Sequence, residues 1–367
     1  MSTDAPGRPH DRHRARGAYR RWRYLGRWLC ICISLLLVTT WVLQRWPGEA
    51  WWGGTLLVYA PQSTWALPLL LVLLGAILTR DRATALTAVL LTPLVLIGLM
   101  GLQWRPSADY PGNRVLTVAA WNLRNEWHNA VHARHTLDAL GADLVLTQEA
   151  IDLHFLPHFQ GFECVRSHGQ RIFVRRSREY REQASETRYE TAGREQSVSS
   201  DGPVHIGEDW RLAHEARLEI DGRRVDVLNV HFIVSSRREA NRVALRSPGY
   251  LRQTEYYRRM QMREVTRWIE SREGPWIVAG DFNTPPGARA WRELPAEARD
   301  VFAERGRGFG YTYRRGLPLW RIDYIWVSPH FHILDAGVFS GPVSDHLGVW
   351  AQLALQERGT NEKAGAP

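Results

Sequence analysis

Three long stretches without a charged residue dominate the N-terminal third of this 367-residue chain. They run over residues 28–44, 50–79 and 83–104. A helix needs about 20 apolar residues, and at least about 17, to cross the roughly 30 Å hydrocarbon core of a bilayer. We therefore expect a membrane region over residues 28–104 that contains about three transmembrane helices. Their expected positions are about 28–45, 62–79 and 83–104.

A cleaved signal peptide is the alternative interpretation of the first apolar stretch. Arg20–Arg27 would then be its basic segment and Leu29–Thr40 its apolar segment. No cleavage site made of small residues follows, and two further apolar stretches do. A signal peptide would end in such a cleavage site and would not be followed by further apolar stretches, so membrane insertion is the better reading.

Charges at the ends of the apolar stretches predict the orientation. Four arginines lie in residues 20–27, before the first stretch, and Arg80 and Arg82 lie between the second and third. Positive residues beside a span favour the cytoplasmic side. We therefore expect residues 1–27 to be a basic cytoplasmic tail and the chain from residue 105 onward to be extracytoplasmic. Trp41, Trp46, Trp51, Trp52 and Trp104 would then lie at the outer interface, where indole rings prefer to sit.

The formal net charge of +9 does not by itself indicate a nucleic-acid-binding protein. Residues 1–28 contain eight Arg and two Asp, so six of the nine excess positive charges lie there. Residues 104–367 keep an excess of only two. A nearly neutral domain lacks the broad basic surface that non-specific binding to phosphate backbones requires. The three cysteines exclude a disulfide framework and a zinc-ligand motif.

From Val115 onward the pattern changes to short apolar strands separated by polar segments. Expected strands lie at 115–121, 144–147, 225–230, 276–279, 322–327 and 348–353, and expected helices at 130–140 and 252–271. Residues 178–210 are charged and weakly periodic, which predicts loops or an irregular insertion. The tail over 356–367 is expected to be disordered. This succession of strands and helices is typical of an α/β domain.

Polar residues stand at or next to the end of almost every one of these strands. Asn, Asp, Glu and His are unusual there, because burial of an unpaired polar group costs about 1–3 kcal/mol. One such case is ordinary, but a whole set of them needs a common cause. The pattern predicts two packed sheets whose polar strand ends converge on one site.

The residues at these strand ends are similar to those of a known enzyme superfamily. They are Trp121-Asn122, Gln148-Glu149, Asn229-Val230-His231, Gly280-Asp281-Phe282-Asn283, Ile322-Asp323-Tyr324 and Ser344-Asp345-His346. In order and rough spacing they resemble the endonuclease/exonuclease/phosphatase superfamily, in its membrane-anchored bacterial branch with N-terminal transmembrane helices. The resemblance covers about residues 115–355. It implies a four-layered α/β sandwich over 105–355, made of two packed mixed sheets flanked by helices, that hydrolyses phosphoesters with a metal ion.

The resemblance also implies a role for each residue. Glu149 would hold Mg²⁺ or Mn²⁺, hard ions that prefer oxygen ligands, and Asn122 and Asp345 would complete or support that site. Asp281 would orient or deprotonate the attacking water, and Asn283 would hydrogen-bond a phosphate oxygen.

Two histidines complete the implied machinery. His346 would form a dyad with Asp323, whose carboxylate fixes the imidazole tautomer and stabilises its charged form. His231 would donate a proton to the leaving group.

Each of these residues also has an ordinary structural reading. Asparagines cap turns, Glu149 would be a surface carboxylate, His231 a structural histidine, and Asp323 a surface partner of Arg321. Six motifs in the family's order make these readings improbable when they are taken together.

Three functions compete for such a domain, because fold alone does not determine substrate. In the first, the protein is a membrane-anchored hydrolase of a lipid-linked phosphate or diphosphate, since a site held beside a leaflet gains effective concentration for lipid head groups. Some three-span members of the superfamily linked to glycopeptide resistance look similar in layout, which makes a polyprenyl diphosphate a candidate substrate. No protein partner is inferable.

The second function is a membrane-tethered nuclease. Its nucleic acid would need a local basic groove, and Arg175, Arg176 and Arg178, or Arg237 and Arg238, are the candidates for one. The third is a non-catalytic binding module in the membrane. The presence of both Asp281 and His346 argues against the third reading.

Overall fold

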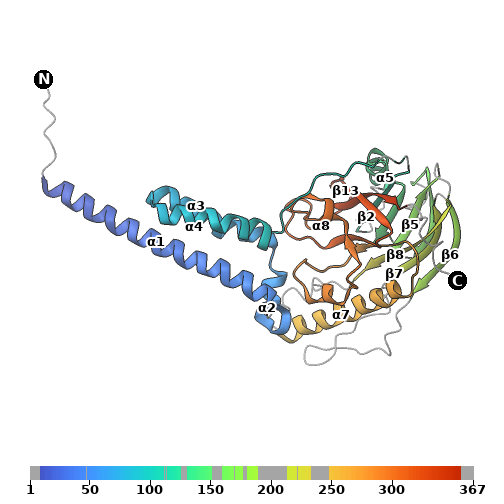
Figure 1. The fold of residues 1–367 in the computed structure, drawn as a ribbon, viewed down its shortest axis with the longest axis horizontal. Coiled ribbons are helices and arrows are strands. Elements are labelled where there is room, and N and C mark those ends of the chain that lie inside the picture. Colours follow the sequence, from blue (N-terminus) through green and yellow to red (C-terminus); the bar gives the residue numbers. More distant parts are fainter. Residues whose placement is uncertain are drawn as a thin grey trace, which may run out of the picture.

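The protein consists of a helical arm and a globular α/β domain at one end of it (Figure 1). The computed structural model describes residues 9–46, 48–110, 112, 114–124, 130–150, 159–168, 170–176, 180–188, 213–220, 222–232 and 248–356. The expected disordered tail beyond residue 356 lies outside these residues, as do residues 1–8 of the expected cytoplasmic tail.

The arm consists of α1 (Pro9–Arg45), α3 (Ala66–Thr79) and α4 (Arg82–Pro93), which continues into the π-helical segment η3 (Leu94–Leu99). Three helices are long and apolar enough to cross a membrane: Arg20–Arg45, Gln62–Thr79 and Arg82–Leu99. The first begins well inside the expected tail, because α1 is helical from Pro9. The third ends at Leu99 rather than at residue 104, since Gly101 takes a left-handed conformation (φ 78°) and Gln103–Trp104 form strand β1.

Close helix packing and ion pairs hold the arm together. A Cβ on Gly75 would lie 2.3 Å from Cys30 Sγ, so only glycine lets α1 and α3 approach this closely. Asp81 accepts a hydrogen bond from Thr84 N (3.0 Å), which caps α4, and pairs with Arg27 (3.2 Å) on α1. Many leucines and isoleucines of the arm point outward and are exposed, as expected of helices that lipid surrounds.

Between α1 and α3 the chain makes three short helical segments that contact the α/β domain. They are η1 (Gly48–Ala50), α2 (Trp52–Tyr59) and η2 (Gln62–Trp65). The apolar stretch 50–79 therefore holds two α-helices, and they are separated at Pro61. Proline lacks the N–H that a continuous helix would require there.

Two six-stranded sheets are formed by the described residues of the α/β domain. The first has the order β13 (Phe331–Phe339), β14 (Gly348–Leu355), β2 (Leu116–Asn122), β3 (Leu144–Gln148), β5 (Gln170–Arg175), β4 (Phe162–His168). The second has the order β10 (Arg299–Asp300), β12 (Asp323–Val327), β9 (Trp276–Asp281), β8 (Arg223–His231), β7 (Ala213–Ile220), β6 (Tyr180–Arg188). Both are mixed, because β2–β3 and β8–β9 are parallel and the other pairs antiparallel.

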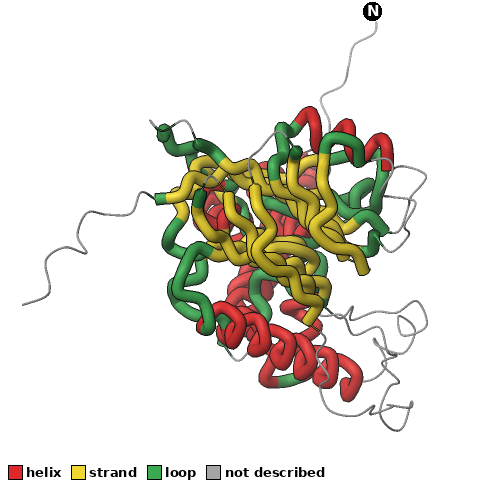
Figure 2. Tube along the Cα trace, turned by 90° about the vertical axis from the view of Figure 1, so that its right-hand side faces the viewer, coloured by secondary structure: helices red, strands yellow, loops and turns green. Residues whose placement is uncertain are grey.

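The main hydrophobic core lies between the two sheets and takes side chains from both. A second cluster packs α5 (Ala130–Ala139) on the outer face of the β2–β3 sheet. A third packs α7 (Pro248–Glu270) and the 3₁₀ turn η6 (Arg289–Glu293) on the outer face of the β8–β9 sheet. Helix, sheet, sheet and helix thus form four layers (Figure 2), and the predicted α/β sandwich is confirmed.

The strand register explains why polar strand ends meet. Asn122 and Gln148 are paired at the carboxyl ends of parallel β2 and β3, and His231 and Asp281 at those of parallel β8 and β9. The antiparallel strand β12 begins at the same edge, with Asp323 opposite Asp281. Since β14 is antiparallel to β2, its start also lies there, just after His346. One edge of the sandwich therefore collects all these side chains.

The expectation of loops over 178–210 is wrong in part. Tyr180–Arg188 form β6, the edge strand that pairs with β7 over its whole length. Such a strand is formed by main-chain pairing with its neighbour, and charged residues are a usual protection of a sheet edge. Residues 189–212 lie outside the described part of the chain.

Candidate active site

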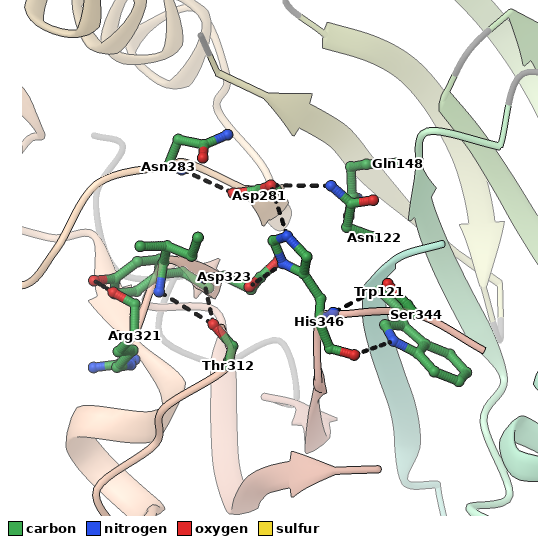
Figure 3. A network of polar contacts seen from close by, with 12 residues as sticks. Trp121, Asn122, Gln148, Asp281, Asn283, Thr312, Arg321, Asp323, Ser344 and His346 are labelled. Carbon is green, nitrogen blue, oxygen red and sulfur yellow. Dashed lines mark hydrogen bonds and ion pairs between the residues drawn. The ribbon is translucent and has the colours of Figure 1, made fainter. Parts of the chain in front are cut away.

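Asp281 lies at the centre of the polar edge (Figure 3). It ends β9 and is only 1% exposed. Its Oδ2 accepts a hydrogen bond from Asn122 Nδ2 (3.0 Å), and its Oδ1 accepts one from the backbone N–H of Asn283 (2.9 Å). His231 Nε2 and His346 Nε2 each lie 3.8 Å from Oδ2. One buried carboxylate thus faces an amide and two imidazoles.

The backbone around Asp281 is constrained by close strand packing. Gly280 has φ 143°, and a Cβ there would lie 2.0 Å from Val230 O on β8. Only glycine permits this approach. Glu149 and Asn283 also have positive φ values, 49° and 48°. Such conformations are costly for residues with a Cβ and collect at functional sites.

His346 and Asp323 form a buried ionic pair. His346 Nδ1 lies 3.0 Å from Asp323 Oδ2, and both side chains are almost fully buried. The Oγ1 of Thr312 accepts the backbone N–H of Asp323 (3.2 Å), and Ser344 Oγ accepts that of His346 (3.1 Å). The indole N–H of Trp121 donates to the backbone carbonyl of His346 (3.1 Å). The two partners are therefore fixed by hydrogen bonds as well as by packing.

Electrostatics favours the charged form of this histidine. Burial alone would lower the pKa of His346, but the carboxylates of Asp323 and Asp281 oppose it and raise the pKa to about 10. Burial, and then repulsion by Asp323, raise the pKa of Asp281 above its usual value. At neutral pH the arrangement holds an imidazolium beside a carboxylate of increased basicity.

Glu149 and His231 lie on the other side of Asn122. Asn122 Nδ2 also donates to Glu149 Oε1 (3.1 Å). His231 Nε2 lies 3.6 Å from the same oxygen, and this buried nitrogen has no hydrogen-bond partner among the described residues. The side chain of Glu149 is 35% exposed. A carboxylate open to solvent beside an amide and an unbonded ring nitrogen fits a divalent cation that prefers oxygen ligands.

A second group could hold a metal ion by position alone. The ligand atoms of Asp281, Asp323 and His346 lie within 4.8 Å of one another. However, the nearest contact in this group is the pair between Asp323 and the Nδ1 of His346. We therefore interpret these three residues as a charge-paired cluster in which the carboxylates hold the imidazole ring.

Asp345 is joined to Arg124 rather than to the groups around Glu149. The Arg124 Nε lies 3.8 Å from Asp345 Oδ2. The charge of Asp345 also contributes to the raised pKa of His346. Its role as a metal ligand therefore remains a prediction.

The side chain of Asn283 is bonded to the end of β8. Its Nδ2 donates to the backbone carbonyl of Phe232 (3.0 Å), which follows His231, while its backbone N–H holds Asp281. The side chain thus links the ends of β8 and β9. Its proposed contact with a phosphate oxygen remains a prediction.

The structure adds residues to which the sequence analysis gave no role. Gln148 Nε2 donates to Asn229 Oδ1 (2.6 Å), and Asn229 Nδ2 donates to Thr147 O and Arg171 O, so these amides join the two sheets beneath the site. The ring of Tyr313 packs 4.8 Å from that of His346. Gln148 and Asn229 belong to the motifs that contain Glu149 and His231, so the sequence held a signal for the amide bridge. It held none for Tyr313.

The two sets of arginines suggested for a nucleic-acid groove receive no support from the described residues. Arg175 is tied to α5, since it donates to Asp138 Oδ1 (2.9 Å) and to Ala142 O (2.7 Å). Arg176 is exposed. Arg178, Arg237 and Arg238 lie outside the described part of the chain.

Comparison with known proteins agrees with this geometry. A sequence model described as Endonuclease/Exonuclease/phosphatase family matches residues 119–346. None of the curated proteins matches the chain. A solved endonuclease/exonuclease/phosphatase from Bacteroides vulgatus is 17% identical with a TM-score of 0.50, over 66% of this chain and 100% of that one.

Two further solved structures are similar at lower scores. One is humanized TDP2 from D. rerio, with 18% identity and a TM-score of 0.48 over 65% of this chain and 99% of that one. The other is a mannosyl-6-phosphatase from Bacteroides thetaiotaomicron, with 20% identity and a TM-score of 0.46 over 65% and 100%. The family match covers more than half of the chain and includes every motif of the polar edge. The protein is therefore a member of the endonuclease/exonuclease/phosphatase family, with the fold of metal-dependent phosphoesterases and nucleases.

Proposed function

We propose that this protein is a membrane-anchored, Mg²⁺-dependent phosphoester hydrolase that acts on a lipid-linked phosphate or diphosphate at the outer face of the membrane. The observation that carries the hydrolase assignment is the buried Asp281 carboxylate, which has an amide and two imidazoles around one oxygen. A carboxylate of raised pKa is suited to accept a proton from water, because a general base works best with a pKa near the operating pH.

The other residues take complementary roles in this proposal. As Asp281 removes a proton from water, the water oxygen bonds to phosphorus and the phosphorus–oxygen bond to the leaving group breaks. The charged ring of His346, held by Asp323, stabilises negative charge on the phosphate oxygens. His231 lies between Glu149 and Asp281 and gives the leaving oxygen its proton.

Glu149 would bind the divalent ion through its carboxylate and Asn122 through its Oδ1, which accepts the backbone N–H of Arg124 (2.9 Å), with Asp345 as a more distant support. When bound, the ion would neutralise phosphate charge and polarise the phosphoryl group. Asn122 contacts both Glu149 and Asp281 through one amide nitrogen. Asn122 would therefore keep the carboxylates of Glu149 and Asp281 at a fixed distance from each other.

Contacts between the site and the helical arm support a lipid substrate. Arg289, the first residue of η6, donates its backbone N–H to the buried carboxylate of Glu49 in η1, the segment that directly follows α1 of the arm. Trp320, near Asp323 in sequence, donates its indole N–H to Tyr59 O (3.0 Å). These contacts, made by residues near Asn283 and Asp323 in sequence, support a site on the side of the domain that faces the arm, where lipid head groups would be close.

The arm itself supports the proposed orientation. The N-terminal end of α1 and the turn between α3 and α4 lie at the end of the arm away from the domain (Figure 1). That end carries the arginines of residues 20–27 and 80–82, whereas Trp46 and Trp104, which are 82% and 80% exposed, follow the helix ends on the domain side. Arginines inside and indoles at an interface match the rules for membrane insertion.

A pair of reporters fused at residue 367 tests this orientation. We expect a reporter that is active only outside the cytoplasm, such as alkaline phosphatase, to be active there, and a reporter that is active only in the cytoplasm to be silent. Fusion of the same pair after Arg80, in the turn between α3 and α4, is the matched control and should give the opposite result. Activity of the cytoplasmic reporter at residue 367 would reverse the proposed orientation.

The function is tested with purified full-length protein in detergent and Mg²⁺. We expect release of inorganic phosphate from a polyprenyl diphosphate and no nicking of plasmid DNA at the same enzyme concentration. Removal of Mg²⁺ with a chelator should reduce the rate by more than about 10³-fold, because several kcal/mol of charge stabilisation would be lost. Added Mg²⁺ should restore it.

Glu149→Gln separates the metal role from the other parts of the site. It should require at least about 10-fold more Mg²⁺ for half-maximal rate, as is typical when a metal site loses a supporting group. DNA nicking without phosphate release would instead make the protein a tethered nuclease. A rate that a chelator does not change would refute the metal role.

A further inference from the structure

Tyr59, at the end of α2, and Gln62, the first residue of the second candidate span, contact a hairpin that holds the catalytic pair. The hairpin spans residues 312–320 and is closed by Tyr313 and Trp320, whose backbone groups exchange hydrogen bonds of 3.0 and 2.7 Å. It lies between the helical arm and the polar edge of the sandwich. Its two strands therefore have different partners.

The outer strand of the hairpin is hydrogen-bonded to the short helical segments between α1 and α3. The backbone N–H of Gln62 donates to Leu319 O (3.0 Å), and the indole of Trp320 donates to Tyr59 O (3.0 Å). The side-chain Oε1 of Gln62 accepts the backbone N–H of Arg321 (3.1 Å). Gln62 is 8% exposed, so it forms a buried two-point contact with the chain immediately before Asp323.

The inner strand of the hairpin is bonded to the catalytic residues. Thr312 accepts the backbone N–H of Asp323 through Oγ1 (3.2 Å), and its carbonyl accepts the N–H of Leu347 (2.7 Å), next to His346. Tyr313 forms a backbone bridge with His346 and packs its ring 4.8 Å away. The backbone N–H of Arg315 donates to Asp345 O (2.7 Å). Figure 3 shows Thr312 and Arg321 beside Asp323 and His346.

We propose that Gln62 is a positioning residue for the His346–Asp323 pair, so that η2, the short helix that opens the second candidate span, supports the catalytic apparatus. This inference rests on the proposed function, in which that pair acts on the substrate. Gln62 touches no reacting group; it holds the hairpin, and the hairpin holds the backbone of both residues. A shift of about 1 Å in a catalytic group costs up to about 10²-fold in rate.

The contact depends on the side-chain oxygen of Gln62, which accepts the backbone N–H of Arg321. Without it the backbone N–H of Arg321, which is buried, loses its partner, and an unpaired buried donor costs about 1–3 kcal/mol. The chain can avoid that cost by moving the outer strand toward water. Such a movement would turn Tyr313 away from His346 and lengthen the distance from His346 to Asp281.

Two nearly isosteric substitutions separate the acceptor from the shape of the side chain. Gln62→Met keeps the length and removes the acceptor, whereas Gln62→Glu keeps both. Gln44→Met is the matched control, because Gln44 lies in the same region and donates to Leu57 O (2.8 Å) without contacting the hairpin. All variants are made in the full chain and assayed in detergent with Mg²⁺ on polyprenyl diphosphate.

We expect Gln62→Met to lower kcat about 10-fold or more with KM within about twofold, because positioning and not binding is affected. Amide hydrogen exchange of residues 312–321, followed by mass spectrometry, should become faster in the same variant. Gln62→Glu and Gln44→Met should resemble the wild type in both measurements. An unchanged kcat in Gln62→Met, or an equal loss in Gln44→Met, would overturn the proposal.

Hydrogen exchange also distinguishes failure of this inference from failure of the proposed function. A wild type without phosphoesterase activity would refute the function. Faster exchange of the hairpin in Gln62→Met alone would then still support the coupling of arm to hairpin. Equal exchange in all variants would refute the coupling whatever the activity.

Discussion

Replacement of Asp281 by asparagine should lower kcat about 10³-fold, within the range of 10²–10⁴ that a positioned general base contributes. The amide is nearly the same size, and its oxygen can still accept the Asn283 N–H that Oδ1 accepts now. It cannot accept a proton from water at neutral pH. It also places an N–H₂ group opposite Asn122 Nδ2, which costs about 1 kcal/mol of stability for one lost hydrogen bond.

The variant is therefore expected to fold, and its Tm in detergent should change by no more than about 4 °C. Asp335→Asn is the matched control. Asp335 lies on β13, outside the polar edge, and pairs with the exposed Arg307 (2.8 Å). Loss of such a pair costs at most about 1 kcal/mol, and its kcat should equal that of the wild type. Turnover by Asp281→Asn within 10-fold of wild type would leave Asp281 without the proposed role.

The parts of the fold that carry the site were predictable from the sequence. The expected strands at 115–121, 144–147, 225–230, 276–279, 322–327 and 348–353 correspond to β2, β3, β8, β9, β12 and β14, with ends that differ by no more than two residues. These strands are largely buried, and most of them are apolar runs with a polar residue at or next to the end that reaches the site. The amphipathic helix expected at 252–271 is likewise α7, Pro248–Glu270.

Other strands were missed because their pattern is not apolar throughout. In β7 the buried Ala216, Leu218 and Ile220 alternate with Glu215, Arg217 and Glu219. This two-residue period is the signal of a strand, but the high charge content hides it. The edge strand β6 has no apolar run at all, so its place depends on backbone pairing with β7.

The candidate site likewise has one part that the sequence predicts and one part that it does not. Convergence of Asn122, Glu149, His231 and Asp281 follows from one rule, that neighbouring parallel strands end at the same edge. The hairpin at 312–320 follows from no such rule. Its position depends on hydrogen bonds to residues 59–62 and 345–347, which only the folded chain brings together. Short-range sequence patterns contain no information on such long-range contacts.

The dyad of His346 and Asp323 is expected to behave as one unit in a double-mutant cycle. His346→Gln should lower kcat about 10³-fold and Asp323→Asn about 10²-fold, whereas the double variant should lose about 10³-fold rather than 10⁵-fold. The reason is that Asp323 is buried behind the imidazole, with its Oδ2 3.0 Å from Nδ1. It acts on the substrate only through the charge and orientation that it gives to His346.

Steady-state kinetics of the four proteins measures this coupling, with Mg²⁺ saturating in each. A loss of about 10⁵-fold in the double variant would mean that the two residues act independently, and Asp323 would then have to contact substrate or metal itself. That outcome would also argue against a cation held jointly by Asp281, Asp323 and His346, whose ligand atoms lie within 4.8 Å of one another, because the ligands of one ion act as a unit. Non-additive losses are expected both of a dyad and of a shared cation site. The Mg²⁺ concentration for half-maximal rate separates the two, since His346→Gln and Asp323→Asn should leave it unchanged if the cation lies at Glu149. The cycle and the Mg²⁺ dependence together therefore decide between the two cation positions that the geometry of this edge allows.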